Sequence, residues 1–287
     1  MRQYTIAGHT IRISGEGLGS LPGFDSFLSD KTESEPLLVI HKETALQDWD
    51  IPPVFASEYE GTSYDLSVRG DTYLFRAKQD DNCLSAEICR EGTGFRAAIC
   101  RTGIFSDISL HYIGWLLFGI AALSRQTVSI HASAVMYQGK SALFLGESGT
   151  GKSTHTRLWL KHFPDTELLN DDSPFIRVEA DGSIRAYGSP WSGKTACYKN
   201  IHTPVAAFVR LSQAPCNRIR RLKGIEAIGA LQPSCPFAFA YDQQLSESIY
   251  SVLSHTLQQT PVYSLECLPD ADAARLVYAT LKQDNYL

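Results

Sequence analysis

Short runs of apolar and β-branched residues recur through the first third of the chain. Gly8 and His9 separate two such runs at a spacing typical of a hairpin. Residues 84–89 alternate between apolar and polar positions, and the polar residues 80–82 before them suit a turn. Strands are expected over residues 4–7, 10–13, 37–40, 72–77, 84–89 and 95–99. The pattern predicts a smaller β-rich domain over residues 1–103.

The pattern changes after residue 103. Ile108, Tyr112 and Trp115 recur at three- and four-residue spacing, which predicts a helix over residues 105–125. Strand-like and helix-like stretches then alternate, as they do in α/β domains. Strands are expected over residues 129–136, 141–145, 167–169 and 206–211, and helices over 153–162, 245–257 and 271–281. We therefore expect an α/β domain over residues 104–287.

Composition and charge narrow the class of protein. Of the 287 residues, 20% are charged and 44% are hydrophobic, which is typical of globular domains and excludes collagen-like, disordered and coiled-coil chains. The formal net charge is −5, so we expect neither nucleic acid nor a membrane surface as a partner. The most apolar stretch, residues 113–123, is about half as long as a membrane-spanning helix, and we expect it to be a buried helix.

Cysteine usage indicates a reducing compartment. The chain has seven cysteines, an odd number, and no two of them form a C-x-x-C motif. A disulfide framework or a structural zinc site is therefore not expected. The first residues lack the apolar segment of a signal peptide. Together these features predict a cytoplasmic protein with reduced thiols.

The clearest motif lies at residues 146–153, where GESGTGKS fits every fixed position of G-x-x-x-x-G-K-[ST]. An apolar run precedes it and a helix-like stretch follows it, which is the context that this motif requires. Glycines let the backbone curl close to phosphates, and N–H groups at a helix start attract anions. Lys152 supplies a charge for the β- and γ-phosphates, and the Ser153 hydroxyl is a suitable Mg²⁺ ligand. The residues expected to bind a nucleotide are Gly146, Glu147, Ser148, Gly149, Thr150, Gly151, Lys152, Ser153 and Thr154.

Two adjacent acids, Asp171 and Asp172, follow the next expected strand. A carboxylate at a strand end beside a phosphate loop is suited to hold Mg²⁺. Neighbouring strand residues point to opposite faces, so one carboxylate can hold the metal while the other orients or deprotonates a hydroxyl. A plain turn is the alternative interpretation of Asp-Asp-Ser-Pro. His131 is either a core residue or a partner that orients one aspartate. We assign catalysis to Asp171, Asp172, His131 and Lys152, and metal binding to Ser153 and Asp172.

These motifs together resemble a known family. Residues 131–134 (HASA), the loop at 146–153 and the Asp171-Asp172 pair, in this order and spacing, resemble the C-terminal catalytic domain of HPr kinase/phosphorylase, the bacterial serine kinase of the phosphotransferase system. They are similar also to shorter HPr-kinase-like proteins found beside peptide-modification genes. The resemblance covers residues 129–195, extends weakly to the C-terminus and does not include the first hundred residues.

The resemblance implies a fold and a chemistry. It implies an α/β P-loop domain of the HPr kinase/phosphoenolpyruvate carboxykinase type, preceded here by the smaller β-rich domain. ATP and Mg²⁺ are the implied cofactors: Lys152 and the loop glycines would bind the phosphates, and Ser153 would bind the metal. The family uses its aspartate pair for both metal binding and general-base catalysis, and His131 corresponds to a histidine near that base.

Two features differ from the family. Thr154 stands where a glutamate usually follows the loop serine, which removes one carboxylate from the metal site. The long glycine-rich signature loop after the aspartates is not found, and residues 188–194 (GSPWSGK) take its place. There Trp191 either packs on the nucleotide or substrate or lies in the core, and Lys194 is a candidate phosphate contact. The kinase half-reaction is therefore a safer inference than phosphorolysis of phosphoserine.

One basic cluster stands out, formed by Arg218, Arg220, Arg221 and Lys223. Apolar residues alternate with these charges, which favours the solvated face of an edge strand. A phosphate clamp formed by Arg218 or Arg220 is the alternative.

The sequence predicts an ATP-dependent kinase that transfers the γ-phosphoryl group to a hydroxyl, with a serine of a small protein or peptide as the first acceptor to consider. The β-rich domain would recognise that partner. Two alternatives stay open: a nucleotide-binding regulatory module without transfer, and a small-molecule phosphotransferase. The sequence also leaves open ATP against GTP and a homo-oligomer.

Overall fold

The structure is a computed structural model that describes residues 1–14, 21–30, 35–47, 49–103, 107–193 and 195–287. The chain divides into two compact units. One combines Met1–Arg125 with Ala238–Ser246, and the other combines Gln126–Phe237 with Glu247–Leu287. The helix expected near residues 105–125 falls in the first unit, so this division comes after Arg125, whereas the sequence placed a boundary after residue 103.

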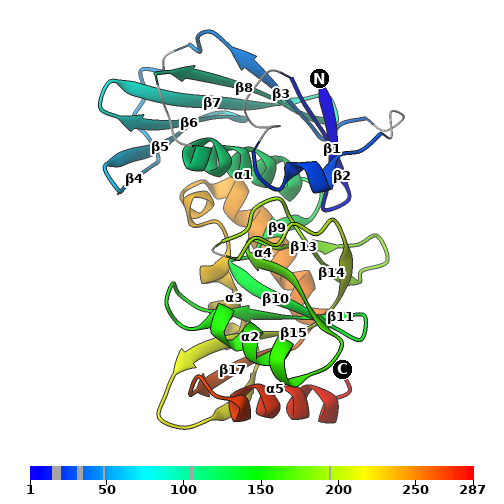
Figure 1. The fold of residues 1–287 in the computed structure, drawn as a ribbon. Helices are drawn as coiled ribbons and strands as arrows, with labels where there is room; N and C mark the ends of the chain where they lie inside the picture. The colour runs from blue at the N-terminus through cyan, green and yellow to red at the C-terminus, as the bar shows by residue number, and fades with distance from the viewer. Residues whose placement is uncertain (15–20, 31–34, 48, 104–106, 194) are drawn as a thin grey trace. The chain divides into compact units, whose positions relative to one another are not determined.

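An eight-stranded sheet forms most of the first unit, in the order β1-β2-β3-β8-β7-β6-β5-β4 (Figure 1). Its pairs are antiparallel except that β3 runs parallel to β2 and β8. The strands are β1 (Arg2–Ile6), β2 (His9–Ile13), β3 (Leu38–Glu43), β4 (Phe55–Tyr59), β5 (Thr62–Arg69), β6 (Thr72–Gln79), β7 (Asn82–Glu91) and β8 (Gly94–Thr102), and a short 3-10 helix, η2, covers Phe24–Phe27. All six strands expected in this region are present.

Two tight turns set the register of paired strands in this sheet. Ala7 and Gly8 join β1 to β2 with φ values of 49° and 77°, and Glu60 and Gly61 join β4 to β5 with 49° and 74°. Two successive positive φ angles define the type I′ turn, whose twist matches that of the flanking strands. The first turn therefore lies one residue earlier than expected, because His9 is already the first residue of β2.

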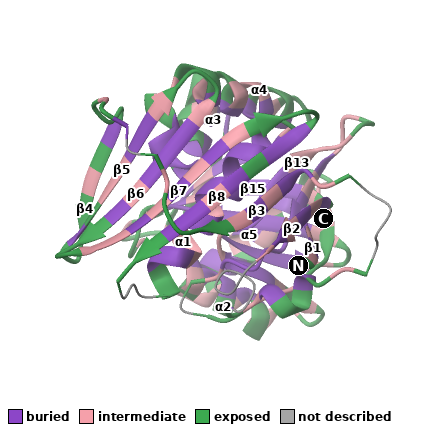
Figure 2. Cartoon of the chain, turned by 90° about the horizontal axis from the view of Figure 1, so that it is seen from above, coloured by how far each residue is buried: buried purple, intermediate pink, exposed green. Residues whose placement is uncertain are grey.

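The helix α1 (Asp107–Leu123) packs against β7 and β8. Leu116, Leu117 and Ile120 are buried on it, and burial of such a side chain contributes about 1.5–3 kcal/mol. Figure 2 shows the inner strands largely buried, whereas β4 at the edge has exposed residues. The apolar stretch 113–123 is thus a buried helix, as expected. Within the described ranges, no helix is long and apolar enough to cross a membrane.

The second unit contains a nine-stranded sheet with the order β12-β10-β11-β15-β14-β13-β9, to which β17 adds beside β15 and β16 beside β17. The strands β11, β15 and β17 are parallel, and β10 is antiparallel to both β11 and β12. The bounds are β9 (Thr127–Ser129), β10 (Ala132–Tyr137), β11 (Lys140–Leu145), β12 (Thr166–Asp172), β13 (Phe175–Val178), β14 (Ile184–Tyr187), β15 (His202–Gln213), β16 (Arg218–Leu222) and β17 (Val262–Cys267).

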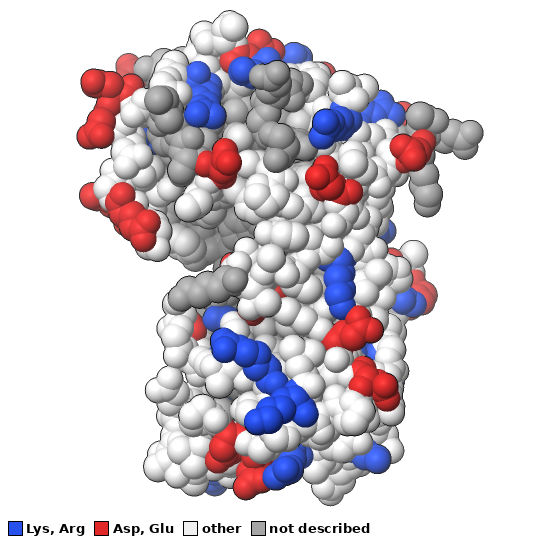
Figure 3. All heavy atoms as spheres, in the orientation of Figure 1, with Lys and Arg blue, Asp and Glu red and all other residues white. Residues whose placement is uncertain are grey.

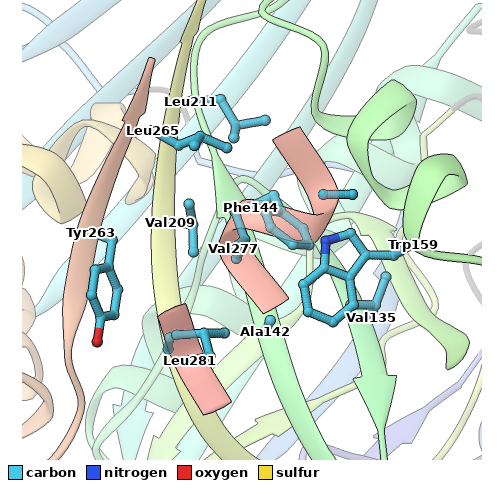
Figure 4. Packing of buried hydrophobic residues seen from close by; sticks show 12 residues of the cluster. Val135, Ala142, Phe144, Trp159, Val209, Leu211, Tyr263, Leu265, Val277 and Leu281 are labelled. Atoms are coloured by element: carbon cyan, nitrogen blue, oxygen red, sulfur yellow. The ribbon is translucent and has the colours of Figure 1, made fainter. Parts of the chain in front are cut away.

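Helices α2 (Lys152–His162) and α5 (Ala271–Gln283) pack on each other, and α2 also packs on β10, β11 and β12. Between them and the sheet lies a cluster of buried side chains, with Phe144 and Trp159 fully buried at its centre (Figure 4). The remaining helical segments are α3 (Ile225–Leu231), η3 (Gln232–Ser234), η4 (Phe237–Tyr241) and α4 (Gln243–Gln259). This cluster anchors both the strand before the phosphate-loop motif and the helix after it.

Sequence and structure differ at a few elements of the second unit. The expected strand over residues 129–136 is two strands, because the ladder stops at Ile130 and His131 between β9 and β10. β17 was not expected, although it is a central strand between β15 and β16. Arg218–Leu222 is indeed an edge strand, and the side chains of its three arginines are exposed, as predicted for a solvated face.

The surface bears both signs of charge. On the face drawn in Figure 3, basic and acidic side chains are interspersed. One example of an exposed ion pair is the bidentate contact between Arg220 and Glu226, with N–O distances of 3.0 and 2.9 Å. Exposed pairs of this kind contribute little to stability. All seven cysteine thiols are free.

Candidate functional site

The motif at residues 146–153 forms a curled loop between β11 and α2. Gly146 has a φ of 151°, and a Cβ there would collide with the hydroxyl of Thr150. That hydroxyl and the Thr150 N–H both donate to the carbonyl of Glu147, at 2.8 and 3.2 Å, and close the turn. The helix α2 starts at Lys152, so its first N–H groups face the curl. This is the geometry in which backbone amides bind phosphate.

Lys152 lies inside this curl. Its ammonium donates to the carbonyls of Gly146 at 2.8 Å and Glu147 at 3.3 Å, and the residue is only 9% exposed. Burial lowers the pKa of Lys152 below its ordinary value, although the carboxylates of Asp172 and Asp171 oppose that change. The loop therefore holds a cation in a desolvated position, where its attraction for a phosphate is strong.

Ser153, the next residue, contacts an acid on the neighbouring strand. Its hydroxyl donates to Oδ1 of Asp171 at 3.0 Å, and Asp171 is 5% exposed. The sheet fixes this pair, since Ser133 on β10 lies opposite Asp171 and also donates to Thr156 on α2 at 3.2 Å. The sequence-based assignment paired Ser153 with Asp172, whereas the structure places Ser153 against Asp171.

Asp172 faces a different partner. Its Oδ1 lies 3.3 Å from Nε2 of His131, and both side chains are about half-exposed. The backbone of Asp172 has a φ of 127°, a region that non-glycine residues rarely adopt and that costs about 1–3 kcal/mol. Gly193 approaches it closely: a Cβ on Gly193 would lie 3.1 Å from Cβ of Asp172. The two aspartates thus have separate partners, and His131 is a neighbour of Asp172 rather than a core residue.

A buried asparagine fixes the segment that presses on this pair. Asn170 is fully buried, and its amide nitrogen donates to the carbonyls of Ser189, Trp191 and Cys197 at 3.3, 3.1 and 3.3 Å. The N–H of Gly193 in turn donates to the carbonyl of Asp171 at 2.6 Å. Asn170 was not among the residues singled out from the sequence, although its place beside two acids at a strand end was a signal.

Trp191 lies in the core, which is one of its two interpretations from the sequence. The side chain is 5% exposed and packs on Phe175, with ring centroids 5.9 Å apart. The candidate phosphate contact Lys194 lies outside the described residues.

A second cation near the loop was also missed. Arg210 lies on β15 directly beside Leu145, the last residue before the loop. Its guanidinium donates to Oε1 of Glu147 at 2.7 Å and to the carbonyl of Ala230 at 3.1 Å. An arginine at the end of an expected strand, next to a strand that leads into a phosphate loop, was the available signal.

A pocket of about 540 Å³ opens along one side of the loop. Its size is that of a small-molecule site. The loop contributes Gly149, Thr150 and Gly151, and α2 contributes Thr154, His155 and Leu158. The opposite wall consists of Leu211, Gln213, Ala214, Cys267, Leu268 and Pro269. Neither Asp171, Asp172 nor His131 belongs to this lining, so the acid pair is not part of the pocket wall.

His155 gives this pocket a neutral polar group. The Trp159 indole N–H donates to its Nε2 at 3.2 Å, so the imidazole N–H is at Nδ1. Burial lowers the pKa of His155 to about 4, and the ring packs on Phe144. The imidazole is therefore uncharged at neutral pH.

The site fits Mg²⁺ held jointly by protein and phosphate. Among the described residues, no group of three or more His, Cys, Asp or Glu side chains is placed to hold a metal. Mg²⁺ rarely needs such a cage, because one or two oxygen ligands, phosphate oxygens and water complete its shell. The adjacent oxygens of Ser153 and Asp171 are donors of this kind.

Comparisons with models of known protein families and with curated proteins found no match to this chain. The residues that the sequence assigned to one site do nevertheless come together around one loop. They are Lys152, Ser153, Asp171, Asp172 and His131, together with Thr154 on the pocket side. The tip residue Ser148 is exposed.

Proposed function

We propose that this protein is an ATP-dependent phosphotransferase that moves the γ-phosphoryl group to a hydroxyl. The observation that supports this most is the curl at residues 146–151, which holds Lys152 beside two acids with different partners. Phosphoryl transfer requires mainly positioning and charge neutralisation, and these residues supply both. The resemblance to HPr kinase/phosphorylase is in accord with this assignment.

Each residue then has a role in binding. The amides of the loop and the start of α2 bind the phosphates, and Lys152 neutralises the charge of the β- and γ-groups. Ser153 and Asp171 would hold Mg²⁺, which supplies charge neutralisation on the phosphate oxygens. The 540 Å³ pocket takes the nucleoside, because it adjoins Gly149, Thr150 and Gly151 of the loop and its lining includes neither aspartate of the acid pair. The γ-phosphate then points toward Asp172.

Asp172 and His131 act on the acceptor. The carboxylate of Asp172 accepts the proton of the acceptor hydroxyl, and the hydroxyl oxygen forms a bond to the γ-phosphorus as the bond to the bridging oxygen breaks and ADP departs. His131 orients that carboxylate through its 3.3 Å contact. The acceptor that the resemblance favours is a serine of a small protein or peptide. The free thiols and the need for ATP favour the cytoplasm as the location.

The test is transfer of labelled phosphate from γ-labelled ATP with Mg²⁺, comparing the native chain with Asp172→Asn. Label in an added serine peptide or in cell-extract protein, lost in Asp172→Asn, is the expected result. Tight ATP binding without label transfer or hydrolysis would instead support the regulatory module. Thr154, in place of the family's glutamate, is the observation that favours that second candidate. No binding of ATP would contradict both.

A further inference from the structure

Arg210 lies at a position where a side chain that binds phosphate is expected. The strands β11 and β15 are parallel, and Arg210 pairs with Leu145, after which the loop begins. Ligands of parallel sheets bind beyond the carboxyl ends of the strands. The guanidinium is held on one side by the carbonyl of Ala230, so it projects toward the loop from a fixed point.

The present partner of Arg210 is a residue of the phosphate loop itself. The carboxylate of Glu147 accepts from the guanidinium at 2.7 Å, and the Glu147 side chain is 71% exposed. This contact and the bond to Ala230 together use two of the five N–H groups of the guanidinium, counted over the part of the chain that the structure describes. The planar fork of an arginine therefore still has donors to offer to phosphate oxygens.

The charges around the loop favour an exchange of partners. Lys152 and Arg210 lie close enough for Arg210 to lower the pKa of Lys152, so two cations approach one another beside the loop. A triphosphate brings more negative charge than one carboxylate, and it would repel Glu147 from the loop. Glu147 is the exposed member of the pair, and water competes for its carboxylate, so breaking the pair opposes the exchange little.

We propose that Arg210 is a direct ligand of the phosphate chain and that Glu147 is an internal anion which occupies Arg210 until the nucleotide displaces it. This rests on the proposed function, because it presupposes a triphosphate on the loop. The competing explanation is that Arg210 acts only through Glu147, as a tie that shapes the loop. The two explanations predict opposite effects of removing the Glu147 charge.

The experiment is calorimetry of MgATP binding to the full chain and to Arg210→Gln, Glu147→Gln and the double variant. We expect Arg210→Gln to weaken binding about tenfold to a hundredfold, the range of a charge-assisted hydrogen bond. Glu147→Gln should tighten binding roughly threefold to fivefold, because it frees the guanidinium. This gain should vanish when Arg210 is also replaced. Arg220→Gln breaks a more exposed arginine–glutamate pair, that with Glu226, and is the control for loss of one positive charge; it should change nothing.

Three outcomes would overturn the inference. Weaker binding by Glu147→Gln would identify a structural tie. An equal gain with and without Arg210 would show that Glu147 acts only as a nearby charge. Unchanged affinity in all variants would remove any role. Because Glu147 is exposed, its variant keeps the test valid if Arg210→Gln folds poorly. Lys152→Ala distinguishes failure of this inference from failure of the proposed function. If Lys152→Ala abolishes ATP binding while the Arg210 series has no effect, only this inference fails. If the native chain does not bind ATP, the proposed function is refuted as well.

Discussion

Ser153 Oγ donates a hydrogen bond to Asp171 Oδ1 across 3.0 Å, which joins the first turn of α2 to the end of β12. The contact brings together, beside one loop, a hydroxyl and a carboxylate from residues 18 positions apart. It leaves Asp172 to face His131 instead. Adjacent residues of one strand can thus serve different functions, because the strand alternates the faces to which they point.

This division predicts different phenotypes for the two aspartates. Asp172→Asn should leave MgATP affinity within about twofold, yet lower kcat by roughly 10²–10⁴, the usual contribution of a general base. Asp171→Asn should instead weaken the dependence of binding on Mg²⁺. Calorimetry with and without Mg²⁺, combined with the transfer assay, measures both effects. Equal effects of the two substitutions on Mg²⁺-dependent binding would contradict the separate roles.

Replacement of Lys152 should act on binding and not on folding. Lys152→Ala removes two hydrogen bonds to loop carbonyls and the cation that the phosphates meet, so ATP affinity should fall roughly a hundredfold. Because burial already disfavours the ammonium, Lys152→Met should unfold at the same or a higher temperature than the native chain. Thermal unfolding followed by circular dichroism is the control. ATP affinity that stays unchanged would refute the assigned phosphate site.

The pocket should discriminate nucleosides from bare phosphate. Leu268 lies on its wall and is 39% exposed, and Leu268→Trp should fill space and weaken ATP binding about tenfold. Inorganic tripolyphosphate, which has no nucleoside, should bind this variant as well as it binds the native chain. Leu160 is 40% exposed on α2 but outside the lining, so Leu160→Trp is the matched control. Equal loss of both ligands in Leu268→Trp would place the nucleoside elsewhere.

Because of His155, the free energy of unfolding should decrease at acid pH. Its pKa falls from 6.5 to about 4 on folding, so the unfolded chain takes up the proton first and stability decreases as pH falls through this window. The loss should reach about 3 kcal/mol by pH 4. His155→Gln keeps an acceptor for the Trp159 N–H but does not titrate. Urea unfolding at pH 7 and 4.5 should therefore show a smaller decrease in the variant than in the native chain.

The curl at residues 146–151 and the two acids beside it could be singled out from the sequence because their signals are local. GESGTGKS needs only its own glycines to curl, and the strands and helix on each side have clear apolar patterns. The partners of the two aspartates could not be inferred from local patterns alone. Asp171 meets Ser153 because β12 pairs with β10 in one particular register, which no local pattern encodes.

Arg210 and Asn170 illustrate what the sequence alone could not supply. Arg210 approaches the loop only because β15 lies parallel to β11, a pairing between residues 65 positions apart. Asn170 acts through three carbonyls from 19 to 27 residues downstream. The strand β17 was missed for a related reason: its place in the sheet comes from its two partners, β15 and β16.

The first unit is completed by a piece of chain that returns after more than a hundred residues. The Tyr73 hydroxyl donates to Asp242 at 3.3 Å, and the ring of Phe239 lies so close to Gly119 that a Cβ there would approach it to 3.2 Å. A fragment that stops at Arg125 would therefore leave bare the surface that Phe239 covers on α1. Anyone who wishes to express this half by itself must graft Ala238–Ser246 back onto it, or expect an insoluble product.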